Sequence, residues 1–94
     1  MLTHVSIAFP SSSSPTIGCE FEATIVDRST FEPAPIAHEI VSSVGGQLDR
    51  GALHLELYAS TLELTTDICS SVSEVRQDLL NSYSIVRSEL HAHA

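Results

Sequence analysis

The stretch that decides the fold is Thr16-Ile-Gly-Cys-Glu-Phe-Glu-Ala-Thr-Ile-Val-Asp27. It alternates apolar and polar side chains over a longer run than any other segment. Successive side chains of an extended strand point to opposite faces, so this run would be apolar on one face and polar on the other. The spacing predicts a half-buried strand over 16–27. Its apolar side consists of Ile17, Cys19, Phe21, Ala23 and Ile25.

The polar side of the same stretch carries two carboxylates, Glu20 and Glu22. They are two residues apart, so their side chains point the same way with about 7 Å between the Cα atoms. The solvated face of an ordinary sheet would explain a lone Glu-x-Glu pair. A functional site is the alternative, and a second segment of the chain favours it.

That second segment runs from Ala52 to Ile68 and repeats the alternation twice. The pattern predicts strands over 52–58 and 61–67, the first of which has leucines 53, 55 and 57 on its apolar side. Glu56 and Glu63 fall on the polar sides of these strands. All three predicted strands therefore carry carboxylate on a polar face.

Two amphipathic segments predict helices over 35–44 and 72–90. The first opens with Pro35 and stops at Gly45-Gly46, and Ser71 with Glu74 forms a capping box before the second. We expect an α+β fold: a partial, mainly antiparallel sheet of about three strands with both helices on one face. A coiled coil fits the second helix less well, since paired charges do not flank its stripe. That stripe comprises Val72, Val75, Leu79, Tyr83, Val86 and Leu90.

The composition of the chain excludes some classes of binding partner. The 94 residues suit one domain, and four Lys plus Arg against twelve Asp plus Glu give a formal charge of −8. With its few arginines scattered and no lysine, such a surface repels nucleic acid and anionic lipid, so neither is expected as a partner. His91 and His93 are assigned no role.

The chain shows neither a signal peptide nor an apolar run long enough to span a membrane, so a cytoplasmic location with reduced cysteines is expected. Cys19 is interpreted as a small buried hydrophobe rather than a nucleophile. Serine and proline dominate Pro10–Pro15, which predicts a flexible arm over 1–15 and an ordered domain over 16–94.

Three motifs together resemble a known family. In chain order they are Gly18-Cys-Glu-Phe-Glu22, Glu56-Leu-Tyr-Ala-Ser-Thr-Leu-Glu63-Leu-Thr-Thr and Val72-Ser-Glu-Val-Arg-Gln-Asp-Leu79. This ordered set is similar to the N-terminal part of the carboxylate–amine ligases of the glutamate–cysteine ligase type 2 family. The resemblance covers about 15–90. It implies a glutamine synthetase-like fold in which sheet carboxylates hold magnesium against the phosphates of ATP. It also implies activation of a carboxylate, typically that of glutamate, as an acyl phosphate that cysteine or another amine attacks.

The same resemblance assigns the acidic residues. Glu20 and Glu22 match the metal-binding pair on the first strand, Glu63 matches a further metal carboxylate, and Glu56 falls at an acidic position before it. Magnesium prefers oxygen ligands, so carboxylates on one sheet face suit it. No catalytic residue is assigned.

Family members are much longer than this chain, and the resemblance implies that their nucleotide-binding basic residues lie in the remaining part. We therefore expect an N-terminal ligase fragment that is inactive alone and works as a homo-oligomer or with a complementing chain. The alternative is a truncated, non-catalytic domain that serves as a binding or oligomerising module. A partial sheet leaves an open edge, which favours association in either case.

Overall fold

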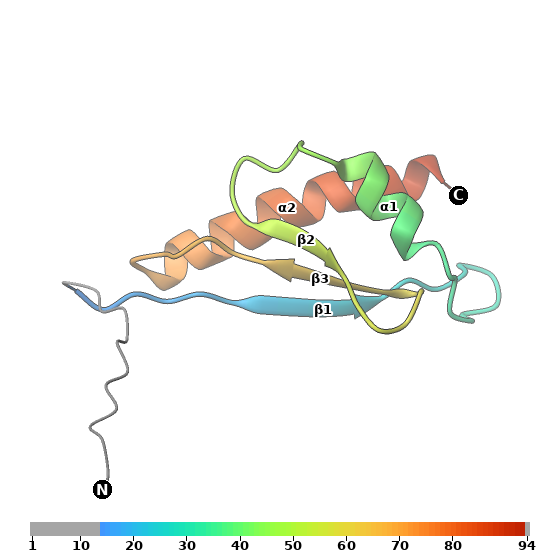
Figure 1. Cartoon of the computed structure of the whole chain (residues 1–94), viewed down its shortest axis with the longest axis horizontal. Coiled ribbons are helices and arrows are strands. Elements are labelled where there is room, and N and C mark those ends of the chain that lie inside the picture. The colour runs from blue at the N-terminus through green and yellow to red at the C-terminus, as the bar shows by residue number, and fades with distance from the viewer. Residues whose placement is uncertain (1–13, 94) are drawn as a thin grey trace, which may run out of the picture.

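A computed structural model of the chain describes residues 14–93. Three strands and two helices follow one another in the order β-α-β-β-α (Figure 1). This arrangement confirms the α+β class expected from the sequence. The elements are β1 (Glu20–Thr24), α1 (Ala37–Val44), β2 (Ala52–Leu55), β3 (Thr61–Thr65) and α2 (Val72–Ala92).

β3 is the central strand of an antiparallel sheet with the order β1-β3-β2. Leu64 on β3 is the Cα partner of both Phe21 on β1 and Leu53 on β2. One row further along, Glu63 is the partner of Glu22. Apolar residues therefore share one face of all three strands, and the glutamates share the other.

Both helices cover the apolar face of the sheet (Figure 1). Leu62 and Leu64 of β3 are each only 5% exposed, because α1 and α2 pack against them. Coverage fades toward β1, where Phe21 keeps 46% of its surface exposed although it points to the same face. The buried core consists of Ile25, Ala37, Ile40, Val44, Leu62, Leu64 and Val86.

The strands are shorter than the alternating pattern predicts. β1 ends at Thr24, and its flanks add only isolated bridges, Ile17 to Cys69 and Val26 to Pro33. The second strand ends at Leu55, so the prediction that Leu57 lies on its apolar side is wrong: Leu57 is 88% exposed. A turn begins there instead, closed by a 3.0 Å hydrogen bond from the Thr61 N–H to the Tyr58 carbonyl.

The predicted signals at the end of α1 and at the start of α2 are confirmed, whereas α1 begins at Ala37, two residues after the predicted start at Pro35. α1 stops at Gly45, which has a φ of 51° and lies in the left-handed region that favours glycine. At the start of α2 the Ser71 hydroxyl accepts a 3.1 Å hydrogen bond from the Glu74 N–H, and the Glu74 carboxylate accepts one of 3.0 Å from the Ser70 N–H. The capping box is confirmed, except that the Glu74 carboxylate accepts its hydrogen bond from Ser70, the residue before the N-cap, and not from the N-cap Ser71 itself.

The predicted apolar stripe of α2 is wrong at two positions: Val72 is 72% exposed and Tyr83 is 49% exposed. The buried face includes Asp78, 4% exposed, and Ser82, 3% exposed. Asp78 can be buried because the Nε of Arg50 donates a 2.7 Å hydrogen bond to its Oδ1. A buried carboxylate is tolerated only when it is paired in this way.

Arg50 and Asp78 tie α2 to the start of β2 and the end of β3. The Asp67 N–H and the Cys69 thiol also donate to Asp78 Oδ2, at 3.3 and 3.5 Å. The Arg50 guanidinium is the main reason that the pKa of Asp78 lies below its usual range. Beside Arg50, Gly51 has a φ of 75°, and a Cβ there would lie 2.3 Å from the Thr65 carbonyl oxygen, so only glycine fits.

The loop after β1 holds an exposed aromatic residue in an unusual conformation. Its turn is closed by 2.8 Å hydrogen bonds from the Asp27 N–H to the Glu32 carbonyl and from the Phe31 N–H to the Asp27 carbonyl. Phe31 has a φ of 60° and is 77% exposed. A left-handed conformation costs a non-glycine residue about 1–2 kcal/mol, and the exposed ring recovers little of this cost by burial.

Residues 1–13 lie outside the described residues, so the arm predicted over 1–15 stays a prediction. Within 14–93, neither helix combines the length with the apolar character that crossing a bilayer requires.

Phe31→Gly should stabilise the chain, because glycine adopts a φ of 60° without the steric cost that a Cβ carries. We expect the free energy of unfolding in urea, followed by circular dichroism, to rise by about 1 kcal/mol. Phe31→Ala is the matched control, since it removes the ring and keeps the Cβ. An equal gain from both variants would show that the ring, and not the backbone, carries the strain.

Candidate functional site

The face of the sheet turned away from the helices gathers the predicted carboxylates. Glu22 and Glu63 are Cα partners on neighbouring strands, and Glu20 is two residues along β1 on the same side. Glu56 follows directly after the end of β2. These four residues, Glu20, Glu22, Glu56 and Glu63, are called the acidic face below.

The backbone places these side chains together although their charges repel one another. Side chains directly opposite in an antiparallel pair have Cβ atoms about 4.5–5.5 Å apart, and like charges in that position destabilise the pair. Glu22 and Glu63 occupy such a position, and Glu63 is also half-buried. The fold therefore keeps a local electrostatic conflict on the acidic face.

The conflict is most evident at Glu63. Its pKa is raised to about 7, first by a hydrogen bond with the Glu56 side chain, then by partial burial and by the negative charges of Glu20, Glu56 and Glu22. Each of these effects disfavours the ionised form of a carboxyl group. A cation at this place would relieve the repulsion, because it would stabilise the ionised form.

The donor set fits magnesium in its chemistry. Among residues 14–93, however, no group of three or more His, Cys, Asp or Glu side chains is arranged to hold a metal ion. Magnesium usually takes one or two protein carboxylates and completes its octahedron with water and phosphate oxygens. The acidic face is thus suited to part of a magnesium shell rather than to an all-protein cage.

One polar neighbour on the acidic face was not predicted from the sequence. His54 on β2 is the Cα partner of Glu63, and its Nε2 lies 3.2 Å from the Thr65 hydroxyl oxygen. The alternation places His54 on the polar side of its strand, but only the register of β2 against β3 shows that it stands beside Glu63. Alternation determines only the face on which a side chain lies, and a shift of the strands by two residues would keep the same faces, so the pattern alone does not identify the partner of His54.

Comparisons with known proteins give a consistent result. Residues 16–93 match the model of glutamate–cysteine ligase family 2. A protein of Frankia casuarinae is 38% identical over 87 residues, which cover 88% of this chain and 22% of that protein. A protein of Gloeobacter violaceus is 34% identical over 85 residues (89% and 23%), and one of Mycolicibacterium smegmatis is 35% identical over 81 residues (86% and 21%).

These three relatives are named "Putative glutamate--cysteine ligase 2" or "2-1". The chain spans between a fifth and a quarter of their length.

Titration of Glu63 tests the electrostatics of the acidic face. In carbon-13 NMR of the side-chain carboxyls, Glu63 should titrate near pH 7, and Glu56→Gln should lower this pKa by removing the largest cause of the shift. Glu32→Gln, in the exposed loop after β1, is the control and should leave it unchanged. A Glu63 midpoint near its ordinary value of 4.5 in the wild type would contradict the arrangement.

The raised pKa of Glu63 also determines how the stability of the fold depends on pH. Between about pH 4.5 and 7 the folded chain holds a proton on Glu63 that the unfolded chain has released. The contribution of Glu63 to the free energy of unfolding therefore falls as the pH rises through that window. Glu63→Gln should remove this decline.

Proposed function

This chain belongs to glutamate–cysteine ligase family 2, and from this premise we propose that it supplies the first metal-binding strands of an ATP-dependent carboxylate–amine ligase. In this proposal Glu20, Glu22 and Glu63 are the candidate magnesium ligands, each ion taking one or two of them and completing its shell with water and phosphate oxygens. Glu56 acts on Glu63, with which it shares a hydrogen bond, and so influences when Glu63 is ionised. The substrates would be ATP, glutamate, and cysteine or another amine.

The observation that carries the proposal is the gathering of Glu20, Glu22 and Glu63 on one face of the sheet, with Glu56 beside them, and this crowding also raises the pKa of Glu63. A structural surface gains nothing from opposing Glu22 to Glu63, whereas a cation site needs such a concentration of oxygen ligands. When bound, magnesium would neutralise charge on the phosphates of ATP and on the phosphoryl group in transfer.

The chain's own residues would prepare that site. β3 holds Glu63 in a fixed position, because both of its edges are paired. The hydrogen bond with Glu56 raises the pKa of Glu63, so Glu63 would have to release a proton to solvent in order to serve as a ligand near neutral pH. Cation affinity should therefore increase with pH around 7.

A site for ATP also needs basic side chains that bind phosphate, and the arginines of this chain do not lie on the acidic face. None of the four arginines lies on β1, β2 or β3, and Arg50 is occupied by Asp78 and Asp67. We propose that the groups that bind nucleotide and acyl phosphate come from further polypeptide, and that the chain alone is inactive. The cytoplasmic location expected from the sequence stays a prediction.

A second candidate function is a non-catalytic module that binds or oligomerises. The partial exposure of Phe21 on the helix side of the sheet favours it, since an apolar side chain at an edge strand invites a partner. The two candidates differ at the acidic face, because only the ligase proposal requires that it bind a divalent cation.

Isothermal titration with manganese tests the ligase proposal. We expect weak binding at a single site, because the acidic face offers carboxylates without the nucleotide that completes the shell. Glu20→Gln combined with Glu22→Gln should abolish the binding. The control is Glu32→Gln with Asp49→Asn, which removes the same charge from two exposed positions off the sheet and should bind like the wild type.

Equal binding by wild type and the Glu20/Glu22 variant would reduce the acidic face to a solvated surface. Ligase turnover with glutamate, cysteine and ATP should stay at background for the chain alone. Measurable turnover would show that the chain supplies more of the active site than we propose.

Self-association is expected under either candidate function. β1 and β2 both lie at sheet edges, and Phe21, Leu80 and Tyr83 are 46%, 44% and 49% exposed. Sedimentation velocity at high micromolar concentration should therefore show a dimer or a larger species that dissociates on dilution. A single monomer boundary at that concentration would contradict this expectation.

A further inference from the structure

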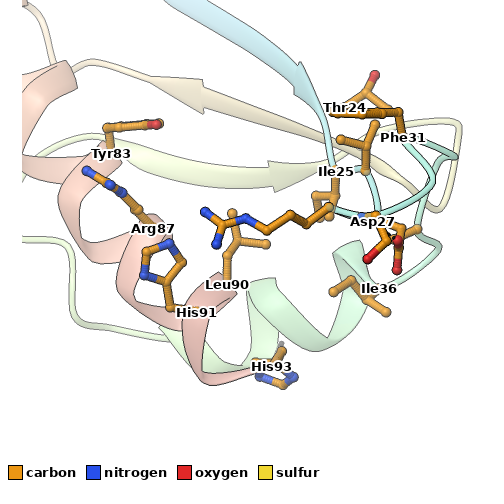
Figure 2. A pocket seen from close by; sticks show the side chains of 14 residues that line it. Thr24, Ile25, Asp27, Phe31, Ile36, Tyr83, Arg87, Leu90, His91 and His93 are labelled. Atoms are coloured by element: carbon orange, nitrogen blue, oxygen red, sulfur yellow. Dashed lines mark hydrogen bonds between the residues drawn. The ribbon is translucent and has the colours of Figure 1, made fainter.

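A groove opens on the helix side of the sheet, away from the acidic face. It lies where the end of β1 and the following loop meet the C-terminal half of α2, and its volume is about 1090 Å³. Figure 2 shows Arg87, Leu90 and His91 on α2 along one side of it, with Asp27, Phe31 and Ile36 along the other. We call this hollow the basic groove.

The basic groove carries positively charged side chains, although the chain as a whole is strongly negative. Arg28 and Arg87, two of four arginines in a chain of formal charge −8, both line it. Neither forms an ion pair with any residue of the described range 14–93, whereas Arg50 is held by two aspartates. Two guanidinium groups are therefore available at one place.

Asp27 is the carboxylate among the lining residues, and the loop already uses it. Its Oδ1 accepts hydrogen bonds from the Ser29 N–H at 2.8 Å, from the Thr30 N–H at 3.0 Å and from the Thr30 hydroxyl at 3.3 Å. These bonds fix the carboxylate within its own turn. Asp27 thus lowers the positive charge of the groove without pairing with Arg28 or Arg87.

The remainder of the lining is apolar and aromatic. Ile25, Ile36 and Leu90 line the groove, and Ile25 belongs to the buried core. Two aromatic side chains at the same groove stay largely exposed: Phe31 at 77% and Tyr83 at 49%. Phe31 lines the groove from a residue whose backbone has a φ of 60°, a conformation that costs a non-glycine residue free energy.

We propose that the basic groove binds a small organic anion with an apolar, ring-bearing body. Arg28 and Arg87 would hold its carboxylate through charge-assisted hydrogen bonds, which a planar guanidinium forms in pairs. The body would lie against Ile25, Ile36 and Leu90, with its ring beside Phe31. A small molecule suits the groove in size, because the groove volume of about 1090 Å³ is close to the roughly 300–1,000 Å³ of small-molecule pockets. The charge of −8 also opposes an extended anionic surface.

Three related probes test the proposal on the full chain: 4-phenylbutyrate, neutral 4-phenylbutanol, and butyrate, which lacks the ring. Nitrogen-15 NMR titration should show saturable binding of 4-phenylbutyrate, with shifts at Ile25, Tyr83 and Leu90. Each of the other two probes should bind at least about tenfold more weakly, since each lacks one half of the recognition.

Arg28→Gln combined with Arg87→Gln should weaken 4-phenylbutyrate binding by about tenfold or more. Arg87→Gln alone should also weaken binding, and Arg76→Gln is its matched control, because it removes one charge from an exposed position of the same helix that does not line the groove. Circular dichroism confirms that the variants fold. Equal binding of the alcohol, equal loss in the Arg87 and Arg76 variants, shifts confined to the acidic face, or no saturable binding would each overturn the proposal. Manganese binding at the acidic face uses other residues, so either site can fail without the other.

Discussion

The structure depends on the pairing of β3 along both of its edges. This strand has two of its leucines, Leu62 and Leu64, in the core and Glu63 on the opposite face. Because side chains alternate, a slip of one residue would place the glutamate under the helices and the leucines in water. The constraint that buries the core thus also assembles the acidic face, so fold and candidate site cannot vary independently.

Local signals account for most of what could be predicted. Strict alternation identified three strands and the side of the sheet on which Glu20, Glu22 and Glu63 lie. Helix ends were equally accessible, since the Ser71 cap and the left-handed Gly45 act within a few residues. Such signals depend only on neighbouring residues, so the structure confirms the predictions that were based on them.

Effects between distant segments account for the failures. Leu57 belongs to a turn that the Thr61–Tyr58 hydrogen bond closes, and a further bond from the Ala37 N–H to the Ala59 carbonyl joins this turn to the start of α1, across 22 positions of the printed sequence. Asp78 is buried on α2 because Arg50 reaches it from before β2. At the candidate site, the partnership of His54 with Glu63 depends on register, and no spacing in either strand encodes it.

Glu20 and Glu22 have a consequence beyond ligand binding, because β1 is an edge strand. If two copies joined edge to edge through β1 in antiparallel fashion, their carboxylates would stand opposite one another, which like charges oppose. The acidic face therefore disfavours pairing through β1 and leaves β2 as the edge at which a second copy can join the sheet. A divalent cation would weaken this repulsion, so metal loading and the pairing of two copies through β1 would be thermodynamically linked.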